Sequence, residues 1–279
     1  PPPPPTHPPT TDTYTNAESS AASDVYKRQA QPLSLQVHPS AEQAAAGFAR
    51  GVFGDDQPKP ELLVALTEFE ALCGLRPPGP TLALLERLEC WELHNAVNEH
   101  GAAGALAALY HDDVDAGVVI ASCEQATGPE AEWVRRLSDR YGSDDTSVAA
   151  VLLLNYVALQ PGEALHLTAG NLHAYLRGSG IELMQASDNV VRGGLTTKPV
   201  DVELLLETLD PTPLPEPVIT AADGRYPLPE AGVVLVRLAP GDSHTATGHE
   251  LAIAMDGTTL YLSPGTPIFA DSETYVVTR

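Results

Sequence analysis

The stretch that most constrains the fold is residues 151–201, where short apolar segments alternate with tight turns. Residues 155–159 and 163–167 are strand candidates, with Pro161-Gly162 as the turn between them. A second turn at residues 169–171 leads directly into His173, which begins a third expected strand. A histidine at a strand start beside a glycine turn is a candidate metal ligand, although a histidine packed at a sheet edge is the commoner case.

A second polar pattern lies upstream, in residues 31–39. In a strand, Gln36 and His38 project from one face, and Leu35 and Val37 from the other, because side chains alternate along a strand. Two polar groups on one face of an apolar strand cost free energy to bury unless something satisfies them. A bound metal would satisfy them, and an edge strand whose polar face meets water would explain the same pattern without a metal.

Four blocks, taken together and in this order, resemble the type I phosphomannose isomerase family. They are residues 32–40 (PLSLQVHPS), 59–77, 154–176 and 187–201. The resemblance runs from about residue 30 to about residue 210 and continues more weakly to the C-terminus. It implies a mainly β fold with a helical insertion, in which a cupin-type β-barrel, or jelly roll, is followed by a second, cupin-like β-rich half.

The resemblance also implies one zinc ion per chain. Its ligands would be Gln36 and His38 of the QxHP block, Glu61 of the KPE block, and His173 after the glycine turn. Two histidines, one carboxylate and one amide oxygen form a zinc site with room for water or substrate. An amide ligand is unusual for zinc, so chemistry alone does not predict the complete set.

The same resemblance implies that Arg192, Glu182 and Lys59 are catalytic. Arg192 would hold the negative charge that develops at the reacting carbons, because its guanidinium stays protonated. Two groups remain open as the base, Glu182 and a zinc-associated water. Lys198 and Arg177 are candidates for binding the substrate phosphate.

The implied activity is that of a mannose-6-phosphate isomerase (EC 5.3.1.8), which interconverts mannose 6-phosphate and fructose 6-phosphate through an enediol. Such an enzyme would serve carbohydrate metabolism and GDP-mannose biosynthesis. Two alternatives stay open. One is an inactive or truncated cupin-type metal-binding module. The other is a different cupin enzyme such as an iron oxygenase, whose three-ligand facial set matches these four residues poorly.

The charge and cysteine content narrow the range of partners and compartments. With 15 Lys+Arg against 37 Asp+Glu the net charge is −22, which argues against nucleic acid and anionic membrane surfaces. A few converging positive groups would still hold a sugar phosphate, the expected small-molecule partner. No apolar run reaches the ~20 residues of a membrane helix. Cys73, Cys90 and Cys123 lack CxxC spacing and indicate free thiols in a reducing compartment, so we expect a cytoplasmic protein, and a monomer.

The composition also predicts how the chain divides. Residues 1–29 are rich in Pro, Ser and Thr and are expected to be a disordered leader, either a functional tail or a foreign sequence. No signal peptide is visible there. The remaining segments are residues 30–79 and 151–210 as the metal-binding catalytic core, 80–150 as a helical insertion, and 211–279 as a linker with the C-terminal β-rich domain.

The chain departs from the family pattern at several positions. Gln57 stands where the family usually has histidine, Thr168 where it has proline, and Arg177 where it has asparagine. Val25 stands where the family has a lysine shortly before the QxHP block. The family's further upstream region has no counterpart in this sequence. We therefore expect a chain that keeps its zinc ligands and lacks part of the family's scaffold.

Overall fold

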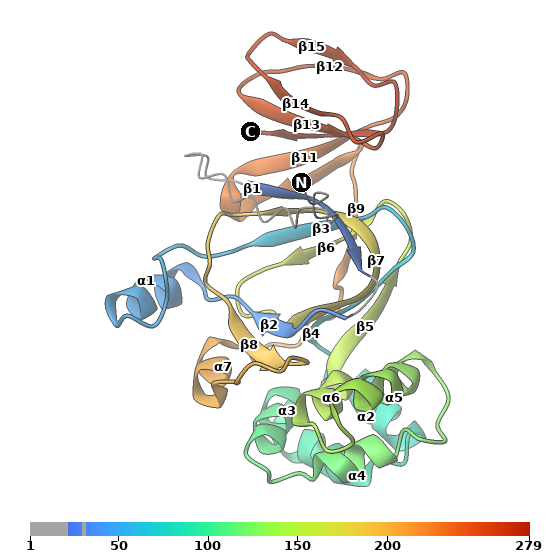
Figure 1. The fold of residues 1–279 in the computed structure, drawn as a ribbon. Helices are drawn as coiled ribbons and strands as arrows, with labels where there is room; N and C mark the ends of the chain where they lie inside the picture. Colours follow the sequence, from blue (N-terminus) through green and yellow to red (C-terminus); the bar gives the residue numbers. More distant parts are fainter. Residues whose placement is uncertain (1–21, 30–31) are drawn as a thin grey trace, which may run out of the picture.

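The computed structural model describes residues 22–29 and 32–279. Its strands are β1 (Ala22–Gln29), β2 (Leu35–Val37), β3 (Glu61–Ala65), β4 (Phe69–Leu75), β5 (Leu154–Leu159), β6 (Glu163–Leu167), β7 (His173–Met184), β8 (Val191–Gly194), β9 (Val218–Thr220), β10 (Arg225–Leu228), β11 (Val233–Leu238), β12 (Ser243–Thr245), β13 (Glu250–Ala254), β14 (Thr259–Leu262), β15 (Pro267–Phe269) and β16 (Thr274–Thr278). Its helices are α1 (Ala41–Ala49), α2 (Pro78–Arg87), α3 (Trp91–Tyr110), α4 (Ala116–Ala121), α5 (Pro129–Tyr141), α6 (Thr146–Ala150) and α7 (Val202–Thr208), with 3-10 turns at Val151–Leu153 and Pro229–Ala231. The expected fold class, mainly β with a helical insertion, is confirmed (Figure 1).

Strand β7 organises the barrel, because it pairs with different neighbours along its length. Residues 173–177 pair with β2 and β4, and residues 178–184 pair with β1 and β3. Further antiparallel pairs, β2–β8, β4–β5, β3–β6 and β6–β9, extend the sheet on both sides. The strands curve around a common interior as a nearly closed barrel (Figure 1).

Gly178 lies where β7 changes partners. Its φ is +130°, and a Cβ at this position would lie 2.7 Å from the Cα of Phe69 and 2.8 Å from the carbonyl oxygen of Glu68. A side chain would therefore collide with the backbone leading into β4 as well as strain the backbone. Glycine at this position allows β7 to pass from one half of the barrel to the other.

Alternation along β3 separates the barrel interior from its outer layer. Leu63 packs inward with Tyr175 and Leu165. Its neighbour Leu62 faces outward and packs against Tyr226 of the C-terminal sheet. The Tyr226 hydroxyl also donates to the carbonyl oxygen of Gly162 at 2.7 Å, which ties the C-terminal half to the turn between β5 and β6. The period-two pattern therefore builds two cores, one on each face of the same strand.

The C-terminal half is a small β-sandwich. A five-stranded sheet, in the order β10-β11-β16-β13-β14, faces the two-stranded sheet β12-β15 (Figure 1). Val236, Ala252 and Val276 are among the buried side chains between the two sheets. This arrangement agrees with the β-rich C-terminal half that the family resemblance implies.

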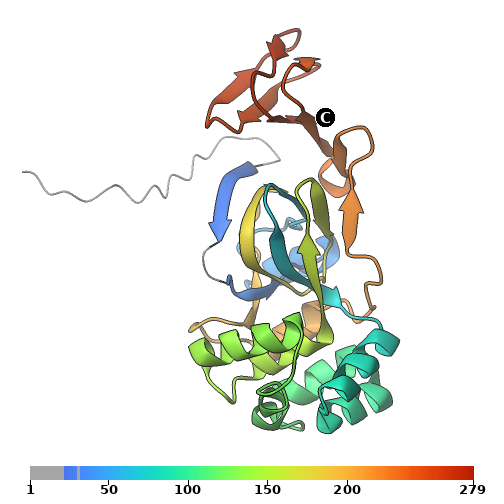
Figure 2. The same cartoon turned by 90° about the vertical axis from the view of Figure 1, so that its right-hand side faces the viewer.

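Helices α2 to α6 gather at the end of the barrel opposite the C-terminal sandwich (Figures 1 and 2). They share an apolar core with side chains of β4 and β2, such as Leu72 and Leu35. Cys73, Cys90 and Cys123 are buried, free thiols, as predicted. Among the described residues, no helix has the length and apolar character needed to cross a membrane.

The predicted disorder over residues 1–29 is wrong for its last part. Residues 22–29 form β1, which runs antiparallel to β7 from Ala22 opposite Met184 to Gln29 opposite Gly178. Residues 1–21 lie outside the described part of the chain. The physical reason is that an unpaired edge of β7 offers backbone donors and acceptors, which a segment can satisfy whatever its side-chain composition.

Candidate metal centre

Three strands bring predicted site residues into one row across the sheet. On β2, Gln36 lies opposite His173 of β7 and opposite Arg192 of β8. On the far side of β7, His173 lies opposite Cys73 of β4. Directly opposed residues of antiparallel strands project to the same face. The sheet therefore presents Arg192, Gln36 and His173 side by side, although the sequence separates the first two by more than 150 positions.

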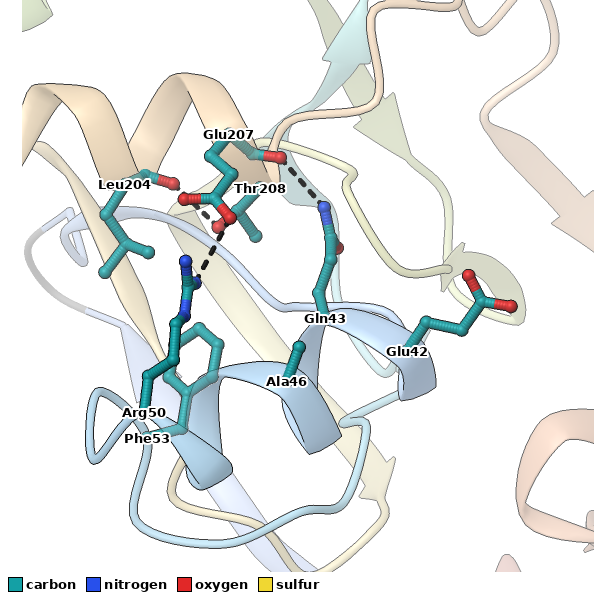
Figure 3. A pocket seen from close by; sticks show the side chains of 8 residues that line it. All are labelled: Glu42, Gln43, Ala46, Arg50, Phe53, Leu204, Glu207 and Thr208. Carbon is teal, nitrogen blue, oxygen red and sulfur yellow. Dashed lines mark hydrogen bonds and ion pairs between the residues drawn. The ribbon is translucent and has the colours of Figure 1, made fainter.

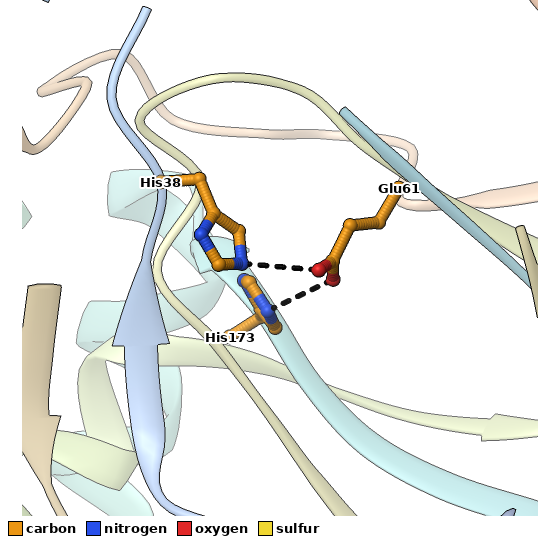
Figure 4. Close-up of side chains that lie close together, drawn as sticks. All are labelled: His38, Glu61 and His173. Carbon is orange, nitrogen blue, oxygen red and sulfur yellow. Dashed lines mark ion pairs between the residues drawn. The ribbon is translucent and has the colours of Figure 1, made fainter. Parts of the chain in front are cut away.

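His38 and Glu61 complete a buried cluster with His173 (Figure 4). His38 directly follows β2, and Glu61 begins β3. The Nε2 atom of His38 lies 3.2 Å from Glu61 Oε1, and that of His173 lies 3.5 Å from Glu61 Oε2. The two rings are 5.3 Å apart between centroids. All three residues are at most 2% exposed, so the sequence-predicted ligands His38, Glu61 and His173 meet in the barrel interior.

Backbone carbonyl groups select which ring nitrogen of each imidazole carries a hydrogen. The Nδ1 atom of His38 lies 2.8 Å from the carbonyl oxygen of Asn189, and that of His173 lies 2.8 Å from the carbonyl oxygen of Asn171. A carbonyl only accepts, so each Nδ1 carries the hydrogen. In the neutral ring this leaves a lone pair on each Nε2, and both Nε2 atoms face Glu61. Orientation of a ligand histidine through its other ring nitrogen is the usual arrangement at metal sites.

The carboxyl group of Glu61 is held in its charged form. Burial by itself raises the pKa of Glu61, but the imidazoles of His173 and His38, when they carry a proton on Nε2, outweigh burial and place the pKa well below 4.5. Lys59 adds a positive charge, with Nζ 3.2 Å from Glu61 Oε1 and only 14% of its side chain exposed. The KPE block thus delivers a buried carboxylate and a lysine to the same place.

The donor atoms fit a metal ion. One ligand atom from each of His38, Glu61 and His173 lies within 4.8 Å of the other two. His38 Nε2 and Glu61 Oε2 are buried without a hydrogen bond, although each lies within 3.5 Å of an atom of another cluster residue. Buried polar atoms left unsatisfied in this way cost free energy that a cation would recover. Two imidazole nitrogens and a carboxylate are ligands that zinc prefers.

Gln36, the fourth expected ligand, lies at the edge of the cluster. Its Nε2 atom is 3.3 Å from Nε2 of His173, so the amide nitrogen faces the imidazole lone pair. A metal ligand must be the amide oxygen, and the side-chain amide would therefore have to turn over. The structure brings Gln36 to the cluster and leaves its role as a ligand a prediction.

Glu182 lies elsewhere in the barrel interior. It is opposite Leu63 on the inner face, is 1% exposed, and accepts a hydrogen bond from the Tyr175 hydroxyl at 2.8 Å. The Tyr175 ring lies 6.0 Å from the His173 ring, so the tyrosine is close to the histidine cluster as well as bonded to the carboxylate. Glu182 is therefore connected to the cluster through Tyr175.

The two phosphate candidates lie apart from the cluster. Arg177 forms an ion pair with Glu70 at 3.0 Å and has a side chain that is 57% exposed. Glu70 alternates on β4 with Phe69 and Ala71, which face the interior, so this pair lies on the outer face. This placement does not support a phosphate role for Arg177.

Lys198 is exposed in the turn after β8, where its backbone N–H bonds to Thr196. Its phosphate role stays a prediction.

A separate small pocket of about 210 Å³ lies between α1 and α7 (Figure 3). Arg50 pairs with Glu207 across it at 3.1 Å, and Gln43 donates to the carbonyl oxygen of Glu207 at 2.8 Å. None of the cluster residues lines this pocket. Its contacts tie the helix that follows His38 to the helix that follows β8, and so brace the strands that carry the row of site residues.

Sequence reasoning missed the residues that orient the ligands. Asn171 and Asn189 act through their backbone carbonyls, and Asn189 also forms a buried side-chain network with the loop before β3. A carbonyl contact leaves no residue-type signal in a sequence. Asn189 lies inside one of the recognisable blocks, so the block marked the segment without giving the role of that residue.

Comparisons with known proteins agree on one family. The family model described as phosphomannose isomerase type I, catalytic domain, matches residues 26–78, including the KPE and QxHP blocks. The mannose-6-phosphate isomerase of Salmonella typhimurium is 34% identical over 230 residues, which cover 72% of this chain and 58% of that protein. Mannose-6-phosphate isomerase 1 of Arabidopsis thaliana is 32% identical, over 64% of this chain and 48% of that protein. The chain thus spans about half the length of these relatives.

Solved structures show the same likeness. The apo form of mannose 6-phosphate isomerase from Salmonella typhimurium superposes with a TM-score of 0.75 and 27% identity, over 91% of this chain and 78% of that chain. A zinc-bound mannose 6-phosphate isomerase superposes with a TM-score of 0.71 and 28% identity, over 91% of this chain and 75% of that chain.

Proposed function

The chain belongs to the type I phosphomannose isomerase family, and from this premise we propose that it is a zinc-dependent isomerase of mannose 6-phosphate and fructose 6-phosphate. The observation that carries the proposal is the buried His38, Glu61 and His173 cluster, with both Nε2 lone pairs directed at one carboxylate. The relatives named as this enzyme, and the zinc-bound neighbour, support it.

His38, Glu61, His173 and Gln36 would hold one zinc ion. When bound, zinc supplies Lewis-acid polarisation of the carbonyl and hydroxyl oxygens of the open-chain sugar. Two neutral imidazoles and one carboxylate leave the centre with a net positive charge, which favours a substrate oxygen as it becomes negative. The hydrogens held on both Nδ1 atoms keep the ligand nitrogens in place while that charge develops.

Arg192 and Lys59 would add positive charge at the rim of this centre. Arg192 stands in the row next to Gln36, and Lys59 lies beside Glu61. Proton transfer between C1 and C2 builds an oxyanion on the sugar, and fixed positive groups lower the free energy of that state. Glu182 is the candidate base within the chain, with the Tyr175 hydroxyl as its hydrogen-bond donor. Lys198 is the candidate for the phosphate.

We further propose that the chain acts in the cytoplasm as a monomer and feeds GDP-mannose biosynthesis. The three cysteines are free thiols, which are typical of proteins in a reducing compartment. The chain is also strongly acidic, with a net charge of −22.

A coupled assay tests the isomerase proposal, with formation of fructose 6-phosphate followed after zinc is added and again after it is chelated. We expect turnover that the chelator removes and that zinc restores, and we expect Arg192→Ala to abolish it while the zinc remains bound. Absence of turnover in a folded, zinc-loaded chain would instead support the second candidate, a metal-binding module without isomerase activity.

A further inference from the structure

Asn189 lies at the junction of the two segments that deliver metal ligands. It belongs to residues 185–190, the connection between β7 and β8, and its side chain is 1% exposed. Its backbone carbonyl contacts the segment that carries His38, and its side chain contacts the loop that leads from α1 into β3. A single buried residue therefore contacts both His38 and the loop that leads to Glu61.

The first contact fixes the imidazole of His38. The carbonyl oxygen of Asn189 accepts the Nδ1 hydrogen of His38 at 2.8 Å. This bond selects the tautomer that leaves Nε2 free to bind a metal, and it sets the rotation of the ring. The position of the Asn189 backbone consequently decides where the ligand atom points.

The second contact is a saturated side-chain amide. Asn189 Oδ1 accepts from the backbone N–H groups of Gly54 and Asp55, at 3.1 and 3.4 Å. Its Nδ2 donates to the carbonyl oxygens of Asp55 and Gln57, at 2.9 and 3.0 Å, and to Asp55 Oδ1 at 3.1 Å. The carbonyl oxygen and both amide hydrogens of the side chain are in use, and all of these partners belong to a single loop.

That loop leads directly to the other side of the metal centre. Lys59 follows Gln57 by two positions, and Glu61 by four. Holding the backbone at residues 54–57 therefore fixes the entry of β3 and the place of its first carboxylate. The amide of Asn189 sets the distance between this loop and the segment that orients His38.

We propose that Asn189 is a positioning residue of the metal centre, which couples the orientation of His38 to the placement of Lys59 and Glu61. The inference rests on the proposed zinc binding and adds a role for a residue that contacts neither metal nor substrate.

The donors and acceptors around this position match the side chain of asparagine. The side chain at this position must accept hydrogen bonds at one end of a planar group and donate them at the other. Aspartate has the same shape but no donors, and it would place a second carboxylate against two carbonyl oxygens and the Asp55 carboxylate. Asn189→Asp is therefore the sharpest substitution, because it preserves volume and reverses the interaction on one side only.

The test is zinc affinity, measured on the purified full chain by competition with a chromophoric chelator. Asn189→Asp keeps the carbonyl that binds His38 but displaces it, so we expect zinc affinity to fall by about tenfold, the lower end of the range for a lost outer-shell partner. Gln185→Ala is the matched control. Gln185 lies in the same connection between β7 and β8, and its side chain donates to the Gln57 side chain at 3.3 Å rather than to Asn189 or His38. We expect this variant to stay within about threefold of the parent affinity.

The results distinguish the positioning role of Asn189 from zinc binding itself. If the parent chain binds no zinc, the proposed function fails. If the parent binds zinc and a folded Asn189→Asp chain, shown by an unchanged apoprotein melt, binds it within about threefold, the positioning role is overturned.

If Asn189→Asp does not fold, Asp55→Ala removes the carboxylate that accepts from Asn189, Ser187 and the backbone N–H groups of Gln57 and Asp188, and it leaves the bonds between the Asn189 amide and the loop backbone. We expect it to weaken zinc binding by about three- to tenfold, and parent affinity in that variant would overturn the role of the loop.

Discussion

Glu250 makes the C-terminal sandwich sensitive to acid. It begins β13, is 3% exposed, and pairs with His244 of β12. Its Oε1 atom accepts hydrogen bonds from the backbone and side chain of Thr247, at 2.9 and 3.1 Å, and from Thr278 of β16 at 2.8 Å. One carboxylate therefore joins three strands that belong to both sheets of the sandwich.

These contacts lower the proton affinity of the Glu250 carboxylate. Burial raises the pKa of Glu250, but the hydrogen bonds just described outweigh burial and lower the pKa from 4.5 to about 2. A carboxyl whose pKa is lower in the folded state contributes stability above its unfolded pKa and loses it as the pH falls toward the folded value. A pKa lowered from 4.5 to about 2 corresponds to about 3 kcal/mol of unfolding free energy at neutral pH, and this stabilisation is lost as the pH falls from 4.5 to 2.

The assay is urea unfolding of the parent and of Glu250→Gln at several pH values between 7 and 2, followed by circular dichroism. The difference in unfolding free energy between the two chains isolates Glu250 from the other acids. We expect about 3 kcal/mol at pH 7, about 1.4 kcal/mol at pH 3, and a value near zero at pH 2.

A difference that does not change with pH would refute the reasoning, because it would show that the glutamine variant alters packing rather than a titrating interaction. A difference that grows as the pH falls would refute the sign of the pKa shift.

Other predictions concern the barrel interior and its rim. Tyr175→Phe keeps the ring and removes the hydrogen-bond donor to Glu182, so the unfolding free energy should fall by about 1.5–3 kcal/mol. In a double-mutant cycle with Glu182→Gln, the two losses of unfolding free energy should not add. Additive losses would argue against the bond. Arg177→Ala should leave turnover within about twofold, because Arg177 is exposed and paired with Glu70 on the outer face, and its exposed ion pair contributes little to stability. Arg192→Ala in the same assay should abolish turnover, and equal effects of the two arginines would contradict their placement.

The sequence predicted the strands and turns around His173 well, because short apolar runs bounded by glycine and proline leave few other structures open. The β6 strand runs from Glu163 to Leu167, as predicted, and the spacing of Ser40 and Gln43 produces a capping box at the start of α1. These features depend on residues close together in the chain, where spacing and side-chain type determine the local structure.

The failures come from contacts between distant segments. β1 forms because the backbone of β7 has an edge to pair, and no composition rule for residues 22–29 reveals that edge. Arg177 was a candidate for binding the substrate phosphate, but a shift in register between Glu70 and Ala71 turns it to the outer face. A bulge of this kind changes which face a side chain occupies, and alternation alone cannot predict it.

The candidate ligands were predicted from a family resemblance, and their convergence depends on register. His38, Glu61 and His173 come from three strands or strand ends, and only the pairing of β2, β3 and β7 brings them together. Residue types alone suggested a metal, whereas the Nδ1 bonds to backbone carbonyls, which prepare both histidines as ligands, required the folded structure.

Zinc content of the purified chain tests the central claim most directly. After loading and exhaustive dialysis, elemental analysis should find about one zinc per parent chain and almost none in His38→Ala or His173→Ala. His166→Ala is the control, because His166 pairs with Glu230 outside the cluster, and it should retain the metal. A parent chain without zinc, or a His173→Ala chain that keeps a full equivalent, would contradict a metal centre at His38, Glu61 and His173.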